Sequence, residues 1–131
     1  MRRGRRRVAS RAFFALLAFP ALVRAGTPAK KGEDSQTRTE AGFLLAYLAW
    51  SACSFYRNGS WHDANAARAH LRGKYDRLSV SNEIGNAEDF IDKVATRSSL
   101  TGEEYAVRCT DGASVPTATW LRAGLERLRR H

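Results

Sequence analysis

The sequence predicts a small α+β domain in which two strands pair antiparallel and helices pack around them. Four segments carry apolar residues at every third or fourth position, which is the spacing of helices with one buried face. Residues 53–57 and 105–109 are short, rich in aromatic or alternating apolar residues, and each precedes a turn signal. The expected order of elements is therefore helix, strand, helix, helix, strand, helix.

The first 25 residues are expected to form a cleavable signal peptide. They hold seven arginines and no acid, an apolar run over residues 13–23, and small residues before a cleavage point after Ala25. The apolar run has 11 residues, whereas crossing a bilayer takes about 20. We therefore expect this segment to be cleaved off, and its retention as a membrane anchor is the alternative. Residues 26–36 are expected to be a flexible lead-in, which leaves residues 37–131 as a single domain.

The charge distribution argues against binding to nucleic acid. The net charge of +9 comes from 22 basic and 13 acidic residues, but without residues 1–25 the balance is 15 against 13. Such a near-neutral domain lacks the positive surface potential that attracts the phosphates of nucleic acids, so no nucleic-acid partner is expected. Membrane association is not expected after signal cleavage. The alternative is that four arginines of the last helix lie on an anionic membrane surface.

The first half of the domain begins with a helix and a strand. Thr37 and Glu40 fit a capping box, in which two side chains satisfy amide donors at the helix start, so a helix is predicted over residues 37–51. The aromatic residues of segment 53–57 predict a short strand. Asn58-Gly59 then predicts a tight turn.

Two helices are predicted in the middle of the chain. Ser60 and Asp63 fit a second capping box, and Asn86 with Asp89 caps a third helix. The buried stripe expected on the second helix consists of Trp61, Ala64, Ala67, Leu71, Tyr75 and Leu78. After the second strand, over residues 105–109, a turn is predicted at Asp111-Gly112 and the last helix after Pro116.

The two cysteines are expected to form a disulfide, because exported proteins mature in an oxidising compartment. If the two strands pair antiparallel with Val107 opposite Phe55, then Cys109 lies opposite Cys53. Opposed residues of this kind have Cα atoms about 4.5 Å apart, which is within disulfide range. The C-x-x-C spacing of redox-active pairs is absent.

One group of residues suggests an anion site. The Arg57-Asn58-Gly59 turn offers a guanidinium and exposed amides, which suit a carboxylate or a phosphate. His70 and Lys74, on the second predicted helix, could extend such a site. The alternatives are ordinary turn chemistry for Asn58 and Gly59 and a structural hydrogen bond for His70.

No recognised catalytic motif, metal cluster or cofactor fingerprint occurs, so no metal and no cofactor is expected. His62 and His70 are eight residues apart on the predicted helix, about 12 Å along its axis, which is too far to share a metal. His70 and Ser99 are the candidate pair for a small envelope hydrolase that acts on cell-wall or peptide material. This enzyme is the alternative to a non-enzymatic binding or interaction module.

The first helix carries two apolar stripes. One is expected to face the core and consists of Ala41, Leu44, Leu45, Leu48 and Ala52. The other, Phe43, Tyr47 and Trp50, lies about 150° away around a helix with 100° per residue. We expect this aromatic face to contact an envelope protein or a second copy of the chain, and burial beneath the last helix is the alternative.

Several segments resemble a known family of proteins. They are FYRNG at residues 55–59, AHLRGKY at 69–75, AEDFIDKVA at 87–95, SSLTG at 98–102, and Tyr105. In this order they resemble the YfeK-like small exported proteins of proteobacteria, a domain family of unknown function. The resemblance implies export and a shared fold, and brings no catalytic residues. We therefore expect a periplasmic or secreted protein, and a non-enzymatic binding or interaction module.

Overall fold

The computed structural model describes residues 32–110 and 112–131. The predicted signal peptide, residues 1–25, and residues 26–31 of the predicted lead-in lie outside this part of the chain. The elements are α1 (Ser35–Trp50), β1 (Ser54–Arg57), β2 (Ser60–His62), α2 (Ala64–Val80), α3 (Ala87–Val94), β3 (Ala106–Arg108), β4 (Val115–Pro116) and α4 (Thr117–Arg129). The α+β class is confirmed.

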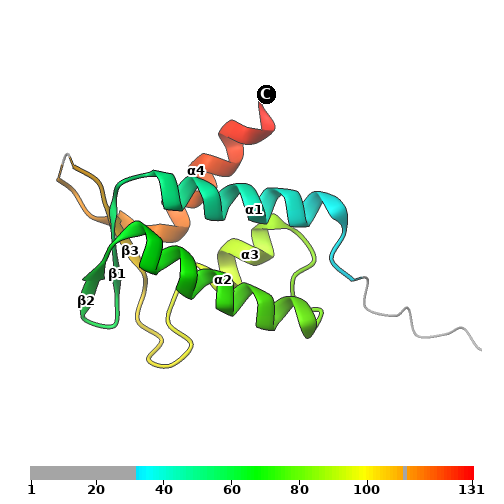
Figure 1. Cartoon of the computed structure of the whole chain (residues 1–131), viewed down its shortest axis with the longest axis horizontal. Coiled ribbons are helices and arrows are strands. Elements are labelled where there is room, and N and C mark those ends of the chain that lie inside the picture. Colours follow the sequence, from blue (N-terminus) through cyan, green and yellow to red (C-terminus); the bar gives the residue numbers. More distant parts are fainter. Residues whose placement is uncertain (1–31, 111) are drawn as a thin grey trace, which may run out of the picture.

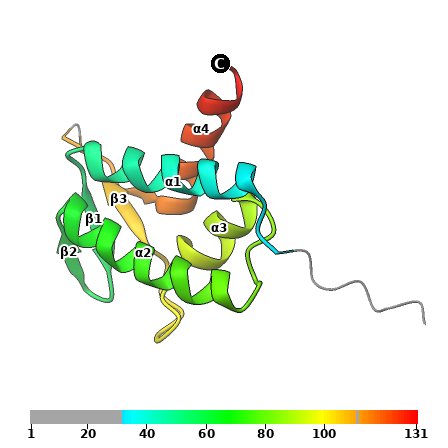
Figure 2. The ribbon, with the colours of Figure 1, turned by 45° about the vertical axis from the view of Figure 1, so that its right-hand side comes forward.

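The sheet lies at one end of the molecule, and α1 and α2 run away from it side by side (Figure 1). Helix α3 lies between these two helices on their inner side, and the last turns of α4 project past α1 (Figure 2). The buried apolar side chains of all four helices and of β1 and β3 form one core. The largest fully buried ones include Phe90, Leu44 and Leu121.

The sheet has four antiparallel strands in the order β2-β1-β3-β4, so the prediction of two strands was wrong. Asn58 and Gly59 both have positive φ, 49° and 87°, which is the geometry of a two-residue hairpin turn. This turn folds residues 60–62 back onto β1, where a helix start was predicted. At the other edge, Val115 and Pro116 pair with β3 before α4 begins.

The predicted strands themselves pair in the predicted register. Phe55 lies opposite Val107, and Ser54 lies opposite Arg108. This places Cys53 and Cys109 at the next position, where they are joined as a disulfide with Cα atoms 4.3 Å apart. The bond therefore links the start of β1 to the end of β3.

Helix starts follow the capping side chains. Asn86 caps α3 as predicted, accepting from the Asp89 amide at 2.8 Å. Helix α1 begins two residues before the predicted start, because Asp34 accepts from the Thr37 amide at 2.8 Å. In the second predicted capping box, Asp63 is itself the cap of α2. Trp61 therefore lies on β2 rather than on the helix.

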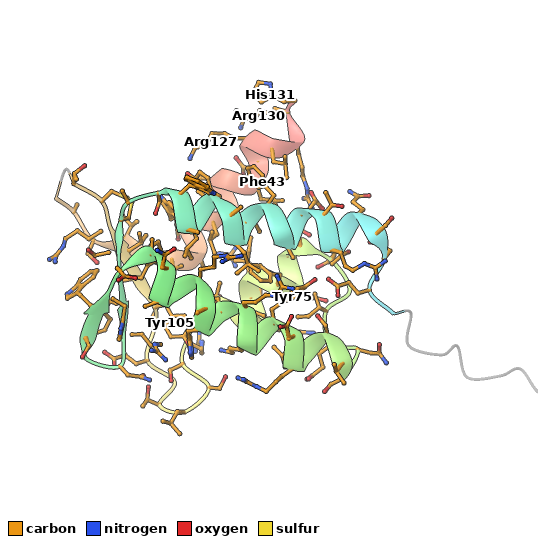
Figure 3. All side chains as sticks on the ribbon, in the orientation of Figure 1. Phe43, Tyr75, Tyr105, Arg127, Arg130 and His131 are labelled. Atoms are coloured by element: carbon orange, nitrogen blue, oxygen red, sulfur yellow. A yellow bond between two sulfur atoms is a disulfide. The ribbon has the colours of Figure 1, made fainter. Side chains whose placement is uncertain are left out.

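The aromatic stripe of α1 is divided between the interior and the surface. The rings of Tyr47 and Trp120 stack at 4.5 Å, and a β-carbon added at Gly124 would lie 2.9 Å from the Tyr47 ring. Phe43, half-buried, stacks on Tyr47 near α4 (Figure 3). Trp50 is 88% exposed. Burial beneath the last helix thus applies to two of these residues, and the exposed face is narrower than predicted.

Arg129 joins three helices at the end of the molecule away from the sheet. Its guanidinium donates to Glu40 of α1 at 2.7 and 3.1 Å, and it also pairs with Glu88 of α3. The hydrogen bond from Arg129 lowers the pKa of Glu88 below its ordinary value. The Glu40 side chain is 9% exposed, so its charge depends on this partner. We call Arg129, Glu40 and Glu88 the arginine clamp.

Candidate functional site

A pocket lies where the β1–β2 hairpin, α2 and the start of α4 meet. The cavity measures about 20 Å³, which is room for a group the size of one water molecule. Its accessible wall is mostly apolar, with Phe55, Ala67 and Leu71 among the lining residues. The side chains with polar groups that line it are Tyr56, Arg57, His62, His70, Tyr105 and Thr117.

Three of these side chains form a hydrogen-bonded chain with a defined direction. Arg57 Nη1 lies 2.8 Å from His70 Nδ1, and because arginine only donates, Nδ1 accepts. His70 Nε2 then carries the proton and donates to the Tyr105 hydroxyl at 3.2 Å. Burial, together with the neighbouring charges of Arg57 and Lys74, lowers the pKa of His70, which favours this neutral ring.

The Tyr105 hydroxyl consequently keeps its own proton for another acceptor. Burial raises the pKa of Tyr105, so the hydroxyl is protonated at neutral pH. Within residues 32–110 and 112–131, the hydroxyl has no partner other than His70. Tyr105 is buried between the sheet and α2 (Figure 3), so it can donate to a group held in the pocket.

Thr117 presents a second unused polar group. It is the first residue of α4 and is 1% exposed, yet its Oγ1 has no hydrogen-bond partner in the described part of the chain. A buried polar atom without a partner costs about 1–3 kcal/mol. No side chain caps α4, because Pro116 occupies the cap position. The positive end of the helix dipole therefore lies at the pocket wall.

The pocket wall carries one arginine, Arg57, and no aspartate or glutamate. Arg57, Lys74 and Arg77 are the cations that act on the His70 ring, and the carboxylate that contacts a lining residue is Glu103, which accepts from Tyr56 at 2.6 Å. An arginine without a carboxylate beside it on the wall makes the cavity a favourable place for an anion or for a strong hydrogen-bond acceptor.

The predicted anion site is only partly assembled here. Arg57 and His70 line the pocket, whereas Lys74 is buried and donates to the Arg97 carbonyl at 2.8 Å. Gly59 has the positive φ that ordinary turn chemistry predicted, whereas the Asn58 side chain accepts from the Thr101 hydroxyl at 2.7 Å rather than bonding its own backbone.

The candidate hydrolase pair is not joined. Both ring nitrogens of His70 are engaged by Arg57 and Tyr105, and Ser99 is exposed on the loop after α3. Neither residue has a hydrogen bond to the other. His70 is therefore unavailable as a general base for Ser99 in this arrangement.

His62 departs from the sequence interpretation. It lies on β2 and lines the same pocket as His70, whereas both were placed along one helix. The hairpin returns the chain toward α2 and brings the two rings to one cavity. The described residues contain no group of three or more side chains suited to hold a metal ion.

Sequence reasoning missed two residues of the pocket that can still donate a hydrogen bond. Tyr105 appeared only as part of a strand and of a family resemblance. Thr117 carried no signal, since a threonine after proline at a helix start is ordinary. Only the fold buries both hydroxyls beside Arg57 and His70.

Comparison with known proteins gives the family. A model described as a family of unknown function, DUF5329, matches residues 35–129. The chain belongs to the DUF5329 family. It is also 48% identical over 52 residues to the "Uncharacterized protein YfeK" of Salmonella typhimurium, a match that covers 40% of this chain and 42% of that protein. No solved structure matches. The resemblance to YfeK-like proteins is thus confirmed.

The part of the chain that matches DUF5329 includes the whole pocket, from Phe55 to Thr117, and the arginine clamp. The family description assigns no ligand and no activity, so chemistry must be argued from the geometry. None of the described helices is long and apolar enough to cross a membrane.

Proposed function

We propose that this DUF5329 domain is a non-enzymatic binding module of the cell envelope whose pocket holds a small ligand. The observation that carries the proposal is that two hydroxyls with capacity to donate line one cavity beside Arg57: Thr117 Oγ1, which has no partner among the described residues, and the Tyr105 hydroxyl, which accepts from His70 and has no acceptor there for its proton. Buried polar groups in folded proteins are almost always hydrogen-bonded. The unpartnered Thr117 hydroxyl and the undonated Tyr105 proton favour a partner that arrives from outside.

The geometry favours binding over catalysis. Arg57 and His70 are held in fixed orientations by the hydrogen-bonded chain, which suits recognition. The hydrolase alternative requires His70 to activate Ser99, and His70 has no free nitrogen for that step. No observation favours the alternative.

Export to the periplasm or to the outside is part of the proposal. It is supported by the charge and apolar pattern of residues 1–25 and by the cysteine pair, whose disulfide is stable only in an oxidising compartment. A near-neutral mature domain also fits a protein with neither nucleic acid nor membrane as its partner.

A protein partner or a second copy at α1 is a second candidate role. Trp50, 88% exposed at the end of α1, is the observation that favours it. Exposed tryptophans are enriched at the centres of interfaces. Trp50→Ser is expected to leave the domain folded and to lower its apparent mass in sedimentation or its retention of envelope proteins. Unchanged association would remove this role.

The pocket is tested with small probes of different charge. The chain purified from the periplasm is titrated with acetate, acetamide, phosphate and methylammonium, and amide shifts are followed by NMR. We expect saturable shifts around Tyr105 for at least one probe, and their loss in Thr117→Val and Tyr105→Phe. Thr119→Val, on the exposed side of α4, is the matched control and retains binding. If no probe binds, the proposed function is wrong.

A further inference from the structure

We infer that the ligand of this pocket is a carboxylate with a short apolar substituent, an inference that rests on the proposed function. The carboxylate would accept from Tyr105 and Thr117 beside Arg57, and the substituent would lie against Phe55 and Leu71.

The first step is the sign of the ligand's charge. A cation is disfavoured because Arg57 lines the pocket and no acidic residue lines it. The uncapped start of α4 adds a positive dipole end, and Thr117 places an unpartnered buried hydroxyl at that point. A helix start attracts anions through its dipole, although the Thr117 amide itself already donates to the Tyr105 carbonyl at 3.0 Å.

The second step concerns hydrogen bonds. The Tyr105 hydroxyl accepts from His70 and keeps its proton to donate. Thr117 Oγ1 is free to donate as well. Arg57 uses Nη1 on His70 and keeps other N–H groups for a ligand. The ligand must therefore accept several bonds at one end, as the two oxygens of a carboxylate do.

The third step separates a carboxylate from a phosphate. Phosphate carries more oxygens and up to two charges, and each oxygen moved from water needs a donor. Phe55 and Leu71, 5% and 4% exposed, line the cavity and offer no donor to further oxygens. A carboxylate leaves its remaining side apolar, which matches these walls.

The apolar walls also limit the substituent. Each methylene group buried contributes about 0.8 kcal/mol, or about fourfold in affinity. The cavity of about 20 Å³ has room for only one water-sized group, so the lining side chains must move apart to admit a carboxylate with a short substituent, and a longer substituent reaches solvent. Affinity should therefore rise from formate to acetate to propionate and then level off. The carboxylate could belong to a free small acid or to the C-terminus of a peptide.

The test is a titration of the periplasmic chain with formate, acetate, propionate and butyrate, followed by NMR. Acetamide, phosphate and methylammonium serve as comparison probes. We expect propionate to bind about fourfold more tightly than acetate, and each comparison probe to bind at least tenfold more weakly than propionate. Acetyl-alanyl-alanine and its C-terminal amide distinguish the two sources: binding of the acid but not of the amide, at an affinity above that of propionate, indicates a peptide end.

Two variants that each remove one positive charge test whether the anion binds beside Arg57. Arg57→Gln is expected to weaken propionate binding at least tenfold, and Arg108→Gln, on the strand β3 at an exposed position, is expected to leave it unchanged. Thr117→Val, which keeps the shape of the side chain, gives a second loss if Arg57→Gln proves to be misfolded. Equal losses in Arg57→Gln and Arg108→Gln would show a general charge effect and overturn the inference.

Different results would contradict the carboxylate inference and the proposed function. If acetamide, phosphate or methylammonium binds at Tyr105 and propionate does not, the pocket is a ligand site and the carboxylate is wrong. If no probe gives saturable shifts and a crystal structure shows only an ordered water on Tyr105 and Thr117, both proposals are wrong.

Discussion

The two ends of the molecule treat buried polar groups in opposite ways. In the arginine clamp, Glu40 and Glu88 both pair with Arg129, so every charge has a partner. At the sheet end, Thr117 Oγ1 has none in the described part of the chain, and the Tyr105 hydroxyl retains a proton to donate. The contrast is that the clamp pairs its charges within the fold, whereas the pocket keeps hydrogen-bonding capacity on which the proposed binding role rests.

The largest expected effect comes from breaking the covalent link at the sheet end. Replacing Cys53 and Cys109 by alanine opens a loop of 56 residues and should cost about 4 kcal/mol, because the unfolded chain gains entropy. Urea unfolding of both forms measures the loss. A difference below about 1 kcal/mol would show that the helical end alone sustains the domain.

The second-largest loss of stability is expected from breaking the arginine clamp. Arg129→Met leaves the Glu40 carboxylate without its cation and should lower the free energy of unfolding by about 2 kcal/mol, less than for a fully buried pair because the Arg129 side chain is 42% exposed. The control is Arg130→Met, which breaks the exposed pair with Glu126 and should cost under about 0.5 kcal/mol. Equal losses in both variants would contradict the distinction between the two ends.

Removing the unpartnered hydroxyl of the pocket should not lower the free energy of unfolding. Thr117→Val removes a buried hydroxyl that has no partner and preserves the side-chain shape, so stability should stay the same or rise by up to about 1 kcal/mol. Thermal unfolding in a buffer without carboxylates measures the change. A loss above about 1 kcal/mol would mean that Oγ1 makes a stabilising bond in solution, to water or to protein.

The smallest effect is on the pH dependence of stability. Because the pKa of folded His70 is lowered from 6.5, the unfolded chain takes up a proton that the folded chain does not as pH falls below this value. Stability should therefore be complete above pH 6.5 and decrease from there as acid is added. His70→Gln should flatten this slope between pH 7.5 and 5.5, whereas His131→Gln, at an exposed terminal position, should not.

Local chemistry in the sequence predicted the parts of the fold that depend on neighbouring residues. The Asn86 cap, the turn at Asn58-Gly59 and the register of Phe55 with Val107 each follow from patterns over a few positions. The register in turn placed Cys53 opposite Cys109. The four helices and the α+β class also followed from the sequence, and Arg57 and His70, singled out together there, line one pocket.

The sequence could not predict strands β2 and β4 or the role of Thr117, the most buried residue of the pocket, for physical reasons. Strand β2 has three residues, too few for an alternating pattern, and Trp61 continued the helical spacing of α2. Strand β4 ends in Pro116, a residue that also starts helices. The importance of Thr117 depends on burial by distant elements, which no local pattern records.

The disulfide has a consequence for the order in which the protein matures. Phe55, Arg57, His70 and Tyr105 all lie inside the loop that Cys53 and Cys109 close, and Thr117 lies eight residues beyond it. Under the proposed export, the chain crosses the membrane from its N-terminal end, so the disulfide can form before Thr117 and α4 emerge. The pocket would then be complete only when α4 packs against the part that the disulfide already links.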